Sequence, residues 1–135
     1  MKKKGSVSEF GQERNERLLA AFKANLRYLG EIPIEEIFSR AASTRAPRFY
    51  VSERRASEVM SRIDRGDSLA TMTPLRRAMY NDIYRIVSEY RRSHPGCSTY
   101  EATFHAVNSE APCFYVTAAS ARVILSRFRN HGGRA

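Results

Sequence analysis

The sequence contains two similar copies of one 18-residue stretch. Residues 111–128 read APCFYVTAASARVILSRF, and residues 46–63, which lie 65 positions earlier, read APRFYVSERRASEVMSRI. Eight of the eighteen aligned positions are identical, and the alignment needs no gap. Repetition of this quality predicts two copies of one structural unit, and it constrains the fold more than any feature of the composition does.

Each copy of the repeat predicts an aromatic anchor followed by a capped helix. A proline at 47 or 112 ends the helix before it, because proline disfavours helical geometry in the preceding residue. Phe-Tyr-Val follows, and then Ser52 or Thr117, whose hydroxyl can accept from the amides of a first helical turn. Apolar residues recur behind each cap with the spacing of one helical face. We expect Phe49 and Phe114 to be core, while the neighbouring tyrosines could lie in the core or at the surface.

Two further helices are predicted before each copy. They cover 12–29 and 33–43 in the first half, then about 74–93 and 98–108 in the second. Thr73 is the expected cap of the helix at 74–93, and Ser98 and Glu101 form a capping box for the helix after it. No segment alternates polar and apolar residues for long enough to predict a strand. The side chains expected to face inward from these helices are Leu18, Leu19, Phe22, Leu26, Leu29, Ile34, Ile37, Phe38, Ala41, Leu75, Met79, Ile83, Ile86, Val87, Tyr90, Tyr100, Phe104 and Val107.

The predicted fold is all-α, with six helices arranged as two tandem trihelical, helix-turn-helix-like repeats packed into one body. The expected segments are a basic flexible arm at 1–11, the first repeat at 12–66, a linker at 67–73, the second repeat at 74–131 and a tail at 132–135. The connection between the second and third helices of each repeat, about eight residues, is longer than the usual helix-turn-helix turn.

A resemblance accompanies this pattern. The strings FYVT-x-x-SARVIL and FYVSERRA resemble a group of small, basic bacterial proteins of the Bacteroidetes type, over most of the chain. The resemblance implies a family, and it carries no activity with it.

The charge of the chain favours a polyanionic partner. The net charge is +9, and 19 of the 23 basic residues are arginine, which binds phosphate through planar, bidentate contacts. Residues 1–30 hold seven basic and three acidic groups, and residues 111–135 hold four arginines and no carboxylate. Nucleic acid is therefore the first partner to consider, ahead of an acidic protein or an anionic membrane surface.

The second capped helix is the better candidate for reading DNA. Glu53 and Glu58 interrupt the arginines of the first capped helix, whereas the second has small residues in its first turn and arginines beyond them. Thr117 could act as a cap alone or also bind phosphate. The predicted DNA-contacting residues are Thr117, Ala118, Ala119, Ser120, Arg122, Arg127 and Arg129, with Lys2, Lys3 and Lys4 of the arm and Arg54 and Arg55 of the first capped helix.

The same features leave a second hypothesis open, a protein-interaction adaptor or dimerisation module without nucleic-acid binding. An enzyme is not expected, because no phosphate loop is present and His94, His105 and His131 have no metal-ligand spacing with Cys, Asp or Glu. We expect no catalytic residues, no metal, no cofactor, no small-molecule substrate and no membrane contact. The absence of a signal peptide's apolar segment, and of a disulfide framework around Cys97 and Cys113, predicts a cytoplasmic chain with reduced, buried thiols.

Overall fold

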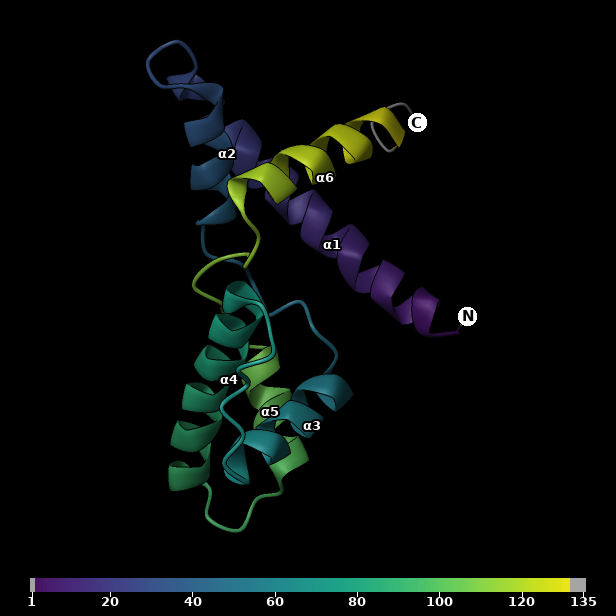
Figure 1. Cartoon of the computed structure of the whole chain (residues 1–135), viewed down its shortest axis with the longest axis vertical. Helices are drawn as coiled ribbons and strands as arrows, with labels where there is room; N and C mark the ends of the chain where they lie inside the picture. Colours follow the sequence, from purple (N-terminus) through teal and green to yellow (C-terminus); the bar gives the residue numbers. More distant parts are fainter. Residues whose placement is uncertain (1, 132–135) are drawn as a thin grey trace. The chain divides into compact units, whose positions relative to one another are not determined.

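A computed structural model (Figure 1) describes the backbone of residues 2–131 and the side chains of residues 10–127. Within these residues all regular secondary structure is helical, with six α-helices and one short 3-10 turn. The predicted all-α class is confirmed. None of the helices in this part of the chain is long and apolar enough to cross a membrane.

The helices divide between two compact units. Unit 1 runs up to Ala46 and resumes at Pro112, and unit 2 is the continuous stretch Pro47–Ala111. The helices of unit 1 are α1 (Lys2–Asn25), α2 (Ile34–Ala42) and α6 (Ala118–His131), with the 3-10 turn η1 (Leu26–Tyr28) after α1. The helices of unit 2 are α3 (Glu53–Asp64), α4 (Pro74–Ser93) and α5 (Thr99–Val107).

This division exchanges the third helices of the two predicted repeats. Helix α6 packs on α2 and α1, although it belongs in sequence to the second half, and α3 packs on α5 and α4. In Figure 1 the yellow α6 lies beside the blue α2. The bounds of the elements keep the 65-residue offset, because α2 and α5 are both nine residues long and start at positions 34 and 99.

Two matching backbone hydrogen bonds fix the exchanged segments. The amide of Phe49 donates to the carbonyl of Val107 at 3.0 Å, and the amide of Phe114 donates to the carbonyl of Ala42 at 3.0 Å. Both donors and both acceptors are again 65 residues apart. Each anchor therefore attaches to the end of a second helix from the other half of the sequence.

Each unit has its own core. In unit 1, Leu18, Ile37 and Leu125 are buried, and the rings of Phe22 and Phe38 stack with their centroids 5.0 Å apart. The most buried large side chains of unit 2 are Phe49, Val59, Met60, Leu69, Ile83, Val87 and Val107. Phe49 and Phe114 have exposed fractions of only 1% and 5%, so the prediction that both are core is confirmed.

The predicted caps form. Ser52, Thr73, Ser98 and Thr117 each accept a hydrogen bond from the amide three residues later. Helix α3 ends at Asp64, and Gly66 shortly after it adopts a φ of +95° that glycine takes without steric cost. The amides of Gly66 and Asp67 donate to the carbonyls of Ile63 and Arg62, which satisfies the last turn.

Several predictions about local structure are wrong. Helix α1 begins at Lys2, so residues 2–11 of the segment expected as an arm at 1–11 lie in this helix; they contain no proline to prevent this. Because α1 ends at Asn25, Leu26 and Leu29 leave its apolar face and are 36% and 57% exposed. Cys97 and Cys113, which were expected to be buried, are only half-buried.

Helix α5 also differs from the prediction, because it buries its small side chains. Ala102, Thr103 and Ala106 are fully buried, whereas Tyr100 and Phe104 are each 51% exposed. Small residues allow the backbone of α5 to approach α3 and α4 closely, and the large aromatic rings then face outward.

The compact units differ from the contiguous segments predicted at 12–66 and 74–131. Each unit combines two helices of one segment with the third helix of the other. The sequence predicts that a turn of about eight residues joins the second and third helices of one repeat, and that these two helices pack together. In the structure this turn connects α2, in unit 1, to α3, in unit 2.

Candidate nucleic-acid interface

The amino-terminal end of α6 is held in two ways. Thr117 accepts a hydrogen bond from the amide of Ser120 at 3.0 Å, and the buried Phe114 anchors the preceding segment to Ala42 at the end of α2. Further along the helix, the side chains of Ala121 and Leu125 are buried in the core of unit 1. These contacts fix which face of α6 points away from the core of unit 1.

The outer face of α6 carries the predicted DNA-contacting residues. Ala119, Ser120, Arg122 and Arg127 are exposed, and Ala118 is half-buried. Thr117 is exposed as well as being the cap. Arg129 lies in α6, but its side chain is outside the described residues, as are those of Lys2, Lys3 and Lys4 in α1.

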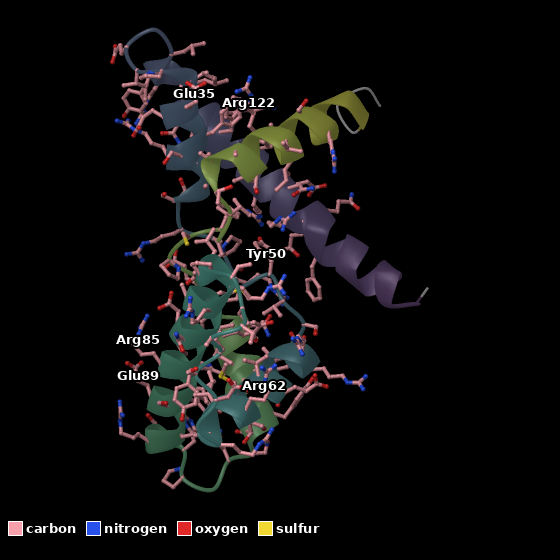
Figure 2. All side chains as sticks on the ribbon, viewed as in Figure 1. Glu35, Tyr50, Arg62, Arg85, Glu89 and Arg122 are labelled. Atoms are coloured by element: carbon pink, nitrogen blue, oxygen red, sulfur yellow. The ribbon has the colours of Figure 1, made fainter. Side chains whose placement is uncertain are left out.

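One carboxylate that the sequence reasoning did not place lies near this face. Glu35 of α2 is 3.8 Å from the guanidinium of Arg122, and both side chains are more than 60% exposed (Figure 2). An exposed ion pair of this kind contributes at most about 1 kcal/mol to stability and is screened by salt. Among the described side chains no carboxylate pairs with Arg127.

Unit 1 collects most of the positive charge. Its residues include 13 basic and six acidic side chains, a net charge of +7, whereas unit 2 has ten basic and eight acidic side chains, a net charge of +2. Both basic ends of the chain, which are far apart in sequence, belong to unit 1, where α1 and α6 pack against each other.

Arg54 and Arg55 belong to unit 2 and lie in a different electrostatic setting. Both are near Glu58, at 3.9 Å and 3.7 Å. Arg62 of the same helix pairs with Asp67 at 2.9 Å (Figure 2 labels Arg62). The arginines of α3 therefore have carboxylate partners, while the position of α6 that corresponds to Arg62, Arg127, has none among the described residues.

Unit 2 has a second feature that the sequence reasoning missed, a shallow groove of about 500 Å³. We call it the aromatic groove. Its lining residues are Tyr90 of α4 and Tyr100, Glu101, Phe104, His105, Asn108 and Ser109 of α5 and the segment after it. The only signal in the sequence is that Tyr100 and Phe104 are four residues apart on one helix, a spacing that predicts a core face.

Stacked rings form one wall of the aromatic groove. The ring of Tyr90 stacks on His94 at 4.0 Å and on His105 at 4.6 Å between centroids. The hydroxyl of Tyr90 donates to Glu101 at 3.0 Å, and this hydrogen bond raises the pKa of Tyr90. Glu101 thus contacts Tyr90 instead of completing the capping box with Ser98.

No metal-binding cluster of His, Cys, Asp and Glu is present in the part of the chain that the structure describes. Comparison with family models, with curated proteins and with solved structures finds no match for this chain.

Proposed function

We propose that this chain is a regulatory or accessory DNA-binding protein that contacts duplex DNA through unit 1, mainly through α6. The observation that carries the proposal is the outer face of α6, which presents arginines and small residues from a unit with a net charge of +7. A polyanion is the natural partner of such a surface, because every neutralised phosphate releases condensed counterions.

The residues of α6 suit a major-groove contact. Ala119 and Ser120 in its first turn let the helix approach base edges closely, and alanine can contact a thymine methyl group. Arg122 and Arg127 are long enough to reach guanine edges or phosphates on either side. Thr117 and the helix N-terminus add an anion-binding end, which is compatible with the capping role of Thr117.

The spatial arrangement of unit 1 supports this role by resemblance to helix-turn-helix domains. Three helices pack together and the last presents a basic face, although α6 comes from a distant part of the sequence and no short turn joins it to α2. Lys2, Lys3 and Lys4 belong to the same unit, and in homeodomain-like proteins a basic amino-terminal segment contacts the adjacent groove.

A second candidate function rests on Val123. This side chain is 49% exposed on the outer face of α6, between Arg122 and Ser126, and an exposed aliphatic residue suits a protein partner or a second copy better than it suits phosphate. The alternative is therefore an adaptor or dimerisation module that uses the same helix.

The proposal is tested by titrating a labelled mixed-sequence duplex with the full chain at 50 mM and 200 mM salt. We expect affinity to fall steeply with salt, with each phosphate contact adding about 0.9 to the slope of log K against log salt. The double variant Arg122→Glu/Arg127→Glu should lower that slope by roughly 2. Arg54→Glu/Arg55→Glu is the matched control, because it makes the same charge change on the equivalent helix of unit 2.

Three outcomes are decisive. Binding that is absent at 50 mM salt, or that does not depend on salt, refutes the proposal. Equal losses in the two double variants contradict the assignment to α6. Loss of self-association in Arg122→Glu/Arg127→Glu, measured by light scattering, with DNA binding unchanged supports the adaptor instead.

A further inference from the structure

Three polar residues of the aromatic groove use their side-chain donors within the protein. Tyr90 donates its hydroxyl proton to Glu101 at 3.0 Å, and Ser109 donates to the carbonyl of His105 at 2.8 Å. The side-chain amide of Asn108 donates to the carbonyl of Phe104 at 2.9 Å and to Glu53 at 3.1 Å. What these groups still offer to a ligand is acceptor capacity on a carboxylate, an amide oxygen and a hydroxyl oxygen.

The charge of the groove is negative, which also favours a ligand that donates hydrogen bonds. Glu101 supplies the one formal charge in the lining, and the sequence from Ser93 to Ala121 contains no lysine or arginine. In a chain with 23 basic residues, the lining of this groove offers a phosphate no lysine or arginine. The complementary ligand is a cation that carries donors and no acceptors and that can lie flat against aromatic rings, which describes a guanidinium.

Unit 1 contains a comparable arrangement, in which a carboxylate and an aromatic ring contact an arginine of the chain itself. Glu36 of α2 is the residue 65 positions before Glu101, and it pairs with Arg40 at 3.5 Å. The guanidinium of Arg40 lies 4.9 Å from the centre of the Tyr28 ring. In unit 2 the glutamate is kept, but His105 occupies the position of Arg40 and stacks on Tyr90. The carboxylate is kept and the arginine is replaced by histidine, while the rings beside the carboxylate in unit 2, Tyr100 and Phe104, come from other positions than Tyr28 does.

The exposed rings are not a requirement of the three-helix unit. Tyr100 and Phe104, each 51% exposed, correspond to Glu35 and Ser39 in α2, which are polar. Because unit 1 folds with polar residues at these positions, the aromatic pair in unit 2 points to a binding role, and large exposed rings are typical of protein-docking surfaces.

We propose that the aromatic groove docks an arginine side chain of a separate polypeptide partner. The guanidinium pairs with the carboxylate of Glu101 and lies against the rings of Tyr100 and Phe104, as Arg40 pairs with Glu36 and lies against Tyr28 in unit 1. This assignment is independent of DNA binding, because it concerns the acidic, aromatic surface of unit 2.

The experiment is an NMR titration of the full chain with Nα-acetyl-arginine amide, followed through the ring signals of Tyr100, Phe104 and His105. We expect saturable shifts with a dissociation constant on the order of 1 mM, the range of a small single-residue ligand. Nα-acetyl-citrulline amide, which has a similar shape without the charge, should bind at least about tenfold more weakly.

Two variants sharpen the test. Glu101→Gln keeps an oxygen that can accept from Tyr90 and should reduce arginine binding at least about tenfold. Glu89→Gln makes the same change on α4 outside the groove (Figure 2) and should leave binding unchanged. If Glu101→Gln does not fold, as judged by its circular dichroism, Phe104→Ala should show the loss of binding in its place.

The proposal is overturned if citrulline binds as well as arginine, or if Glu101→Gln folds and binds normally. It is also overturned if thymidine monophosphate shifts the same rings more strongly than the arginine probe does. A Glu101-dependent dimer at the concentration of the titration would place a second copy of the chain in the groove and would refute a separate partner.

Discussion

Cutting the chain between α3 and α4 tests the exchange of the third helices. The connection from Arg65 to Thr73 is exposed at Ala70 and Thr71, so a protease site inserted between these two residues is accessible. After cleavage, the first fragment contains α1, α2 and α3, and the second contains α4, α5 and α6. Each unit then needs helices from both fragments, so we expect the cut protein to remain a one-to-one complex.

The size of the effect follows from effective concentration. A short linker holds the two halves at roughly millimolar effective concentration. At about 10 µM protein the loss of the linker therefore costs about 2.7 kcal/mol, which is less than the ordinary stability of a folded domain. Each tenfold dilution of the cut protein should remove about 1.4 kcal/mol more and lower its Tm by roughly 5 °C.

Size-exclusion chromatography and thermal unfolding at three concentrations measure both effects, with the uncut insertion variant as the control. The control should have a Tm that does not depend on concentration. Two fragments that separate on the column and keep concentration-independent melting would show that each half folds by itself, and would refute the exchanged arrangement.

Three further changes probe single contacts, each measured by urea denaturation. Phe114→Ala should destabilise the protein by about 3–5 kcal/mol, because it empties a buried anchor; a change below 1 kcal/mol would contradict the anchoring role. Thr117→Ala should cost about 1 kcal/mol through loss of the cap, whereas Thr117→Ser should cost little. Hydrogen bonds from Arg91 and Tyr84 lower the pKa of Asp64, so its contribution is present above the unfolded pKa and is lost as pH falls through the folded pKa. Asp64→Asn should be less stable than the parent at pH 7, and the difference should shrink below about pH 4; a difference that grows in acid would reverse the sign of this reasoning.

The helices and their caps could be predicted from the sequence because the patterns that indicate them are local. Four caps, at Ser52, Thr73, Ser98 and Thr117, were read from hydroxyl residues placed before apolar periodicity, and all four accept the expected amide. The helices against which each third helix packs could not be predicted from the sequence. The apolar residues of α3 and α6 follow the same spacing, so no local pattern distinguishes an exchanged from an unexchanged arrangement.

The two candidate sites also differ in whether the sequence could predict them. The exposed arginines of α6 could be predicted, because the buried face marked by Ala121 and Leu125 determines the opposite, outer face. The aromatic groove could not, because hydrophobicity alone places Tyr100 and Phe104 in the core. Only the packing of α5 shows that its smaller residues, Ala102 and Ala106, take that place.

The exchange also sets an order for folding during protein synthesis. Unit 2 is continuous in sequence, so it is complete once the ribosome has released residue 111. Helices α1 and α2 are made first, yet they must wait for α6. At translation rates of roughly 5–20 residues per second, that delay is on the order of 4–18 seconds, during which α2 can pack on α1 but lacks the cover that α6 supplies. A chaperone that acts on this nascent chain would therefore meet the earliest helices, and not the most recent ones, as its substrate.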